Sequence, residues 1–312
     1  MPQNSVKVSY AEVTPDEAGQ RLDNWLLARL RGVPRSHVYR IIRSGEVRVN
    51  KGRAKALQRL RAGDSVRIPP VRSEPRPPVA TSQEQAARLN GAVLYRDHDL
   101  LVLNKPPGWA VHGGSGLNGG LIDAVRSLWG EDWQLAHRLD RDTSGCLLLC
   151  RRREVLRAFQ QALAEDRVEK RYSAIVHGQW PRGLTRLDSP LARSGRIGGE
   201  RRVQEDAGGK QAVTEVAVAR QWPLACLLDL RIRTGRTHQI RVQTAAADHP
   251  VVGDDKYGRR ALDAGLGLPR APRLCLHARA LRLEWAGSPI DAEAPPPPAF
   301  EAVLTALDKS CP

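Results

Sequence analysis

Hydrophobic and polar positions in the N-terminal part of the chain follow helical spacing first and strand spacing afterwards. In RLDNWLLARL (21–30) three leucines recur every fourth residue, and SHVYRIIRSG (36–45) carries a similar apolar face, so both stretches predict short helices. In EVRVN and DSVRIPP, apolar residues alternate with polar ones as in strands. The pattern predicts a small α/β domain of helix-helix-strand order over residues 21–72, after an N-terminal extension at residues 1–20.

A larger domain is predicted over residues 89–308. VLYRDHDLLVLNKP (93–106) has the pattern of a hairpin, and further strand-like runs follow in CLLLC, RYSAIVHG, TEVAVARQW and LLDLRIRT. Helices are expected around residues 156–163 and in the C-terminal EAVLTAL. Because tight turns as well as helices join the strands, the predicted fold class is α+β, with a mixed, largely antiparallel sheet and flanking helices.

Between the two domains the composition changes. PPVRSEPRPPVATS (69–82) holds five prolines with mixed charges, a composition that favours extended backbone without a core. Residues 73–88 are therefore predicted to form a Pro-rich linker.

Positive charge is concentrated in the small domain. The chain has 49 Lys and Arg against 34 Asp and Glu, and residues 21–72 alone hold fourteen basic and three acidic residues. A basic surface gains affinity for polyanions by releasing counterions from phosphates. We therefore predict RNA contact by basic residues of this domain, namely Arg35, Arg40, Arg43, Arg48, Lys51 and Arg53. The alternative is a basic domain that only packs against its neighbour.

The sequence gives no sign of a membrane segment or of a metal. The first residues lack an apolar signal core, and no apolar run is long enough to span a bilayer, so a cytoplasmic protein with no membrane partner is expected. The five cysteines are odd in number and form no CxxC pair, which disfavours a disulfide framework or a zinc site.

Charged residues gather immediately before an apolar strand in AHRLDRDTSGCLLLC (136–150). A carboxylate at the mouth of a strand is accessible to a substrate, and Asp140 would need a cationic neighbour to stay ionised there. From these residues alone, a substrate site and a structural ion-pair network are equally good interpretations.

A second arginine-rich stretch, RTGRTHQIRVQ (233–243), follows a predicted strand. His238 suggests an acid–base role, although histidine in a polar turn more often makes a structural hydrogen bond. Arg241 is the better candidate partner for a distant carboxylate, because guanidinium binds carboxylate in a fixed two-pronged geometry.

Five ordered blocks resemble the RluA-type pseudouridine synthases. They are HRLDRDTSG (137–145), EKRYSAIVHG (169–178), TGRTHQIRV (234–242), VGDDKYG (252–258) and RLCLHARAL (273–281). The first domain resembles the small RNA-binding domain of a ribosomal small-subunit protein and of tyrosyl-tRNA synthetases. GVPRSHVYRIIRSGEVRVNKGR, VRIPPVR and VLNKPPGWAVHGGSGL further resemble the RluC-type members, which act on 23S ribosomal RNA. The resemblance covers nearly the whole chain from Arg21 onward.

The resemblance implies isomerisation of uridine to pseudouridine in 23S ribosomal RNA or its precursor, and it implies four site residues. Asp140 would be the essential carboxylate, and Arg241 would hold it ionised. Tyr172 would stack on the flipped uracil, although an ordinary strand tyrosine is the alternative. Arg138 would occupy the place that the base leaves in the RNA. Gln243 departs from the family, whose members often carry histidine there.

The implied reaction breaks the bond from uracil nitrogen to ribose carbon 1′, turns the base and joins ring carbon 5 to the sugar. No redox change or group donation occurs, so no cofactor and no metal are expected. Unlike a glycosidase with its two carboxylates, the site needs one carboxylate and a dry pocket. Attack of Asp140 on carbon 1′ and abstraction of the 2′ proton both remain open.

Two other motifs in the sequence carry no catalytic prediction. The glycine-rich HGGSGLNGG (112–120) lacks the ending of a phosphate loop and is interpreted as a loop near the cleft. GDD (253–255) lacks a third carboxylate for a metal and is interpreted as a structural turn. The alternative functions are a non-catalytic RNA-binding assembly factor and a synthase acting on other large-subunit or transfer RNA uridines. A monomer is expected.

Overall fold

The chain folds as two units, one within residues 1–79 and the other within residues 80–312. The structure is a computed structural model that describes residues 7–30, 32–71, 81–113, 119–197, 200–268 and 272–310. The first half of the predicted linker, residues 73–80, and most of the glycine-rich loop, residues 114–118, lie outside the described ranges.

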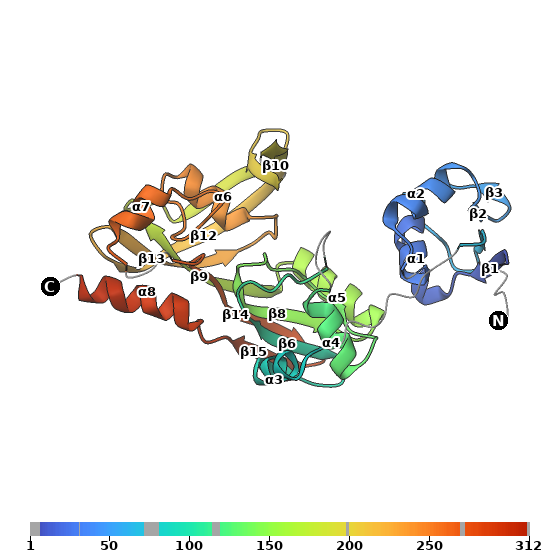
Figure 1. Ribbon diagram of the computed structural model, residues 1–312, viewed down its shortest axis with the longest axis horizontal. Coiled ribbons are helices and arrows are strands. Elements are labelled where there is room, and N and C mark those ends of the chain that lie inside the picture. The colour runs from blue at the N-terminus through green and yellow to red at the C-terminus, as the bar shows by residue number, and fades with distance from the viewer. Residues whose placement is uncertain are drawn as a thin grey trace. The chain divides into compact units, whose positions relative to one another are not determined.

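The N-terminal unit is a four-stranded antiparallel sheet with two α-helices (Figure 1). Its strands run in the order β1-β4-β2-β3. Both predicted helices and the predicted strands are present. The elements are β1 (Ser9–Glu12), the 3₁₀ helix η1 (Pro15–Glu17), α1 (Leu22–Arg29), α2 (Arg35–Arg43), β2 (Arg48–Val49), β3 (Gly52–Arg53) and β4 (Ser65–Ile68).

The apolar faces of the two helices form the core of this unit. Trp25 and Leu26 of α1 pack with Val38 and Ile41 of α2, and all four side chains are buried. The residues predicted as an N-terminal extension also belong to this unit, because β1 pairs antiparallel with β4. That strand has three exposed residues of four, so it is held by backbone hydrogen bonds and leaves little apolar pattern in the sequence.

The C-terminal unit is built on one large sheet, whose main path is β11-β10-β12-β13-β9-β14-β8-β6-β5, with β15 paired to β14 and β7 to β8. All the described pairs are antiparallel except β14 with β8. The predicted α+β class with a largely antiparallel sheet is confirmed. The strands are β5 (Val93–Arg96), β6 (Leu100–Lys105), β7 (Gln134–Leu135), β8 (Ser144–Cys150), β9 (Val168–His177), β10 (Arg186–Ile197), β11 (Glu200–Glu205), β12 (Lys210–Gln221), β13 (Ala225–Ile232), β14 (Leu276–Trp285) and β15 (Ser288–Glu293).

Helices lie around both ends of this sheet (Figure 1). They are α3 (Gln83–Gly91), α4 (Leu121–Trp129), α5 (Arg153–Ala164), α6 (Gln239–Ala246), α7 (Arg260–Gly265) and α8 (Pro298–Lys309). The run CLLLC is apolar throughout because both faces of β8 are covered: Leu147 and Leu149 pack in the cluster that includes α4, whereas Leu148 packs with Phe159 of α5.

The predicted linker extends too far toward the C-terminus. Residues 83–91 form helix α3, which begins with a capping box: Ser82 accepts from the backbone N–H of Gln85, and the Gln85 side chain accepts from the N–H of Ser82. Leu89 of this helix is fully buried in the main core. The helix is short and mostly polar, with Leu89 as its one buried residue. It therefore has too weak an apolar pattern to be distinguished from the proline-rich segment before it.

No helix in the described ranges is both long enough and apolar enough to cross a membrane.

Candidate active site

Asp140 lies in the loop between β7 and β8, and a buried lysine, Lys105, donates a hydrogen bond to the backbone of this loop. The Nζ of Lys105, at the end of β6, donates hydrogen bonds to the carbonyl oxygens of Pro106 at 2.9 Å, Trp109 at 3.0 Å and Arg141 at 2.8 Å. Burial lowers the pKa of Lys105 to about 7, although the negative charges of the two neighbouring aspartates oppose this change. The lysine therefore ties the end of a core strand to the backbone beside Asp140.

A glycine sets the point at which this loop enters the sheet. Gly145 has a φ of +107° and pairs in parallel with Ala278 of β14. A Cβ at this position would lie 2.2 Å from the carbonyl oxygen of Ala278. Only glycine can therefore lie this close to β14 at the start of β8, directly after the loop that carries Asp140.

The predicted partners Asp140 and Arg241 meet although they are 101 residues apart in the chain. Nη1 of Arg241, in α6, donates to Oδ2 of Asp140 at 3.4 Å, and the two side chains are only 6% and 16% exposed. The contact places the positive charge of Arg241 beside the Asp140 carboxyl group.

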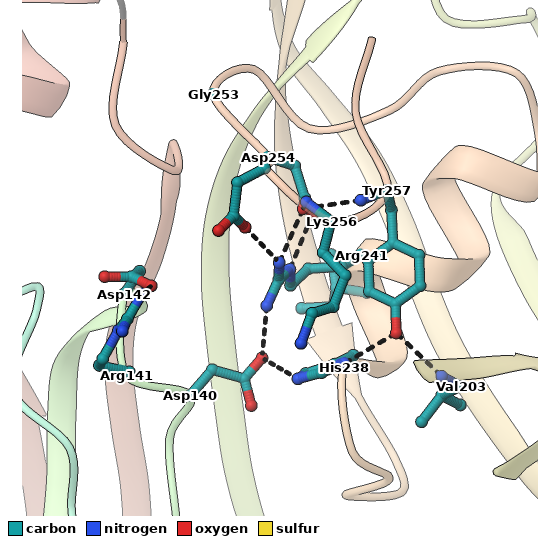
Figure 2. Close-up of polar contacts among 12 residues, drawn as sticks. Asp140, Arg141, Asp142, Val203, His238, Arg241, Gly253, Asp254, Lys256 and Tyr257 are labelled. Atoms are coloured by element: carbon teal, nitrogen blue, oxygen red, sulfur yellow. Dashed lines mark hydrogen bonds and ion pairs between the residues drawn. The ribbon is translucent and has the colours of Figure 1, made fainter. Parts of the chain in front are cut away.

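Arg241 is itself oriented by a second carboxylate (Figure 2). Asp254 accepts from its Nε and from its Nη2, both at 2.7 Å. Asp254 also accepts backbone hydrogen bonds from Lys256 and Tyr257. Burial alone would raise the pKa of Asp254, but the hydrogen bonds from Arg241 hold it below its ordinary value. This forked pair fixes the plane of the guanidinium and leaves Nη1 for Asp140.

His238 approaches the same oxygen of Asp140 from the N-terminus of α6. Its Nε2 lies 3.8 Å from Oδ2 of Asp140, and its Nδ1 lies 2.8 Å from the hydroxyl of Tyr257 (Figure 2). The Tyr257 oxygen also accepts from the backbone N–H of Val203 in β11 at 3.0 Å. Burial lowers the pKa of His238, with Asp140 opposing the change and Arg241 adding to it. The imidazole is therefore neutral near pH 7.

The turn before α6 gives His238 its direction. His238 has a φ of +53°, a left-handed conformation that residues other than glycine seldom adopt. Gln239 fixes the turn: its side-chain oxygen accepts from Thr234 and from the backbone of Arg236, and its amide donates to the Val213 carbonyl in β12. His238 thus faces the pocket because the hydrogen bonds of the Gln239 side chain hold the turn against β12.

Asp140, Arg241 and Tyr172 line one pocket with a cavity volume of about 90 Å³, together with His238 and Arg138. Leu139, Ile232, Ile240 and Leu276 supply the apolar part of its wall. Tyr172, in the central strand β9, is 8% exposed. Burial raises its pKa, and the charge of Asp140 raises it further, so the phenol stays neutral beside the carboxylate. Arg138 is exposed.

The six basic residues predicted to contact RNA are all exposed on the N-terminal unit. Two of them make backbone contacts: Arg53 donates to the Ser44 carbonyl and Arg48 to that of Lys51, each at 3.3 Å. Within the described ranges, no group of three or more His, Cys, Asp or Glu residues is arranged to hold a metal ion. The four cysteines in those ranges are buried and unpaired by disulfides.

Comparison with known proteins gives this geometry its context. A model of the RNA pseudouridylate synthase family matches residues 99–246, and a model of the S4 domain matches residues 20–66. The ribosomal large subunit pseudouridine synthase C of Haemophilus ducreyi is 47% identical over 284 residues, which cover 90% of this chain and 89% of that protein. The chain belongs to the RNA pseudouridylate synthase family. The protein of the same name from Escherichia coli K12 is 46% identical over 297 residues, covering 92% of each chain.

A solved structure agrees with this family assignment. Human RNA pseudouridylate synthase domain containing 4 superposes on this synthase with a TM-score of 0.60 at 27% identity, covering 72% of this chain and 95% of that one. The predicted resemblance and the predicted enzyme class, an isomerase that makes pseudouridine, are confirmed.

Three residues of the site were not identified from the sequence. Residues 253–255 do form a turn, as interpreted, but Asp254 is also the forked partner of Arg241. The resemblance blocks contained Tyr257 and Lys105 without assigning them a role. For Lys105 a signal existed: a charged residue ends a mainly apolar strand, and a buried ammonium requires acceptors nearby.

Proposed function

We propose that this synthase converts uridines of 23S, large-subunit ribosomal RNA into pseudouridine, with Asp140 as the catalytic carboxylate. The observation that carries the proposal is the pocket in which Asp140 meets Arg241 beside the buried phenol of Tyr172. The choice of RNA is supported by the relatives named as ribosomal large subunit synthases, which match about nine-tenths of the chain, including the S4 domain.

In this proposal a uridine leaves its stack, at a cost of a few kcal/mol, and its base enters the pocket. Asp140 then either attacks ribose carbon 1′ or abstracts the 2′ proton, and the base turns and rejoins through carbon 5. Arg241 keeps Asp140 ionised, and the neutral Tyr172 stacks on the base and shields the carboxylate from water. Arg138, exposed at the pocket, takes the place of the base in the RNA.

The N-terminal unit would supply binding energy through Arg35, Arg40, Arg43, Arg48, Lys51 and Arg53. This division assigns RNA binding to residues 21–72 and catalysis to residues 89–308. We further propose that the enzyme works as a monomer in the cytoplasm, on the mature 23S RNA or its precursor.

The test is to map pseudouridines in ribosomal RNA from cells that lack the gene, then from the same cells carrying the wild-type gene or Asp140→Asn. Large-subunit pseudouridines should disappear with the gene, return with the wild type and stay absent with Asp140→Asn. The variant should still bind the RNA with little loss, because the substitution removes one charge and no volume. An rRNA pattern that is unaltered by loss of the gene would refute the ribosomal target. Restoration by Asp140→Asn would support the assembly-factor alternative.

A further inference from the structure

Among the described residues, both partners of the Asp140 carboxylate lie on the same oxygen. Arg241 Nη1 and His238 Nε2 each approach Oδ2, at 3.4 and 3.8 Å. Oδ1 has no hydrogen-bond or ion-pair partner among the described residues. Figure 2 shows this second oxygen directed away from both neighbours. The carboxylate is therefore held by one oxygen and presents the other.

The hydrogen bonds of Tyr257 favour one of the two neutral tautomers of His238. The Tyr257 oxygen already accepts from the N–H of Val203, so its own O–H is free to donate to Nδ1 of His238, 2.8 Å away. A neutral imidazole that accepts at Nδ1 has its hydrogen on Nε2, and this N–H faces Asp140. Burial, Arg241 and Lys256 all favour the neutral imidazole, whereas Asp140 and Asp254 oppose it.

The ring of Tyr257 is fixed on its other sides as well. The guanidinium carbon of Arg241 lies 5.3 Å from the centre of the phenol ring, and the His238 and Tyr257 rings form a T-shaped pair with their centres 5.5 Å apart. The hydroxyl is thus directed at one point of β11 and one nitrogen of His238. A tyrosine placed in this way orients the imidazole rather than touching the substrate.

We propose that His238, oriented by Tyr257, is a positioning residue that fixes Oδ2 of Asp140 so that Oδ1 faces the ribose. This inference rests on the proposed function and deepens it. The role is the same whether Oδ1 attacks carbon 1′ or takes the 2′ proton. At 3.8 Å the contact is longer than a hydrogen bond, and we expect it to shorten once the uridine fills the pocket, as catalytic contacts commonly do.

The experiment measures single-turnover pseudouridine formation and, separately, RNA affinity, with a large-subunit ribosomal RNA fragment as substrate. His238→Leu removes the N–H, whereas His238→Gln replaces it with an amide N–H of similar reach. Both variants bear the same left-handed backbone, so their difference isolates the donor. His238→Leu should slow single turnover about tenfold or more, the usual effect of losing a hydrogen bond to a charged group. His238→Gln should recover most of the rate, and the Kd for RNA should change less than about twofold in both.

Tyr257→Phe tests whether the tyrosine acts through the histidine. It keeps the ring and removes the hydroxyl, so it should also slow single turnover, and adding it to His238→Leu should cost little more, because coupled residues are not additive. Tyr95→Phe is the matched control: it removes an exposed tyrosine hydroxyl bonded to Asp97 at 2.8 Å, away from the pocket, and should leave the rate unchanged.

Three results would overturn the inference: wild-type speed in His238→Leu, equal slowing in the Leu and Gln variants, or additive losses in the double variant. A wild-type chain that forms no product on the RNA would refute the proposed target, and this inference with it.

Discussion

The bond between Arg241 and Asp254 can be tested separately from the chemistry by Asp254→Asn. The substitution keeps the shape of the side chain but removes the charge that faces Nε and Nη2 of Arg241 at 2.7 Å. Arg241 then remains buried, 6% exposed, with the half-buried Asp140 3.4 Å from its Nη1. A guanidinium left in this state is a partly uncompensated buried charge.

The expected loss follows from that burial. Removing one partner of a buried ion pair costs about 3–5 kcal/mol, and the asparagine oxygen can still accept one of the two bonds, so we expect about 3 kcal/mol. The unit that contains the pair spans residues 80–312. For a domain of this size the loss corresponds to a drop in Tm of roughly 6–12 °C. Single turnover should slow too, because Nη1 is no longer held toward Asp140.

The stability that ionised Asp254 contributes depends on pH. The folded pKa of Asp254 lies below its ordinary value of 3.8, so the stability from its ionised form is present above that value and lost as the pH falls through the lowered folded pKa. Thermal unfolding of wild type and Asp254→Asn should therefore differ fully at pH 7 and converge on strong acidification.

Asp255→Asn is the matched control for this substitution. Its carboxylate also lies near Arg241, 3.4 Å from Nη2, but is 70% exposed, and an exposed pair contributes under about 1 kcal/mol. Equal Tm values for wild type and Asp254→Asn at pH 7, or an equal loss in both variants, would refute the assignment of Asp254 as the buried anchor of the site.

Two further predictions concern the loop and the basic unit. Lys105→Met should lower the free energy of unfolding at pH 7 by about 1–3 kcal/mol, measured in urea, because three carbonyls beside Asp140 lose their donor. Stability should rise more steeply from pH 7 toward 10 in the wild type than in the variant, since Lys105 titrates at about 7 when folded and at 10.5 when unfolded. Lys170, whose pKa burial lowers to about 8, adds the same rise to both proteins. Replacing Arg35, Arg40 and Arg43 together with glutamine should make the slope of log Kobs for RNA against log salt shallower by about 2–3, measured by filter binding. An unchanged slope would remove these arginines from the RNA contact.

Much of the fold could be predicted because buried faces of helices and strands require apolar residues at regular spacings in the sequence. The helices of the N-terminal unit and the strand CLLLC could be predicted because their apolar faces are wide or continuous. β1 and α3 left weak patterns: the first is mostly exposed and held by backbone pairing, and the second has one buried residue. A strand held by backbone hydrogen bonds, or a helix held by one buried side chain, leaves little hydrophobic pattern in the sequence.

The residues of the site could also be predicted only in part. Arg241 was predicted from its chemistry as a carboxylate partner. Spacing in the sequence could not show that Asp254 would bind its Nε and Nη2. Nor could a two-aspartate motif reveal which carboxylate is buried: Asp254 has no exposed side-chain surface, whereas the adjacent Asp255 is mostly exposed. The tight loop after Gly253, where a Cβ would lie 2.3 Å from the Arg273 carbonyl oxygen, makes this distinction.

Asp254 and Asp140 contact Arg241 in different ways, and the difference suits the role proposed for Asp140. Asp254 takes the forked contacts at 2.7 Å, and Asp140 receives one longer contact at 3.4 Å. A carboxylate clamped on both oxygens would have its lone pairs committed and would make a poor nucleophile or base. Because Asp254 fills the fork, the guanidinium can stabilise the charge of Asp140 while binding it weakly. The bidentate pair thus fixes the guanidinium in place beside Asp140, and in the proposed mechanism Asp140 keeps its other oxygen for the ribose.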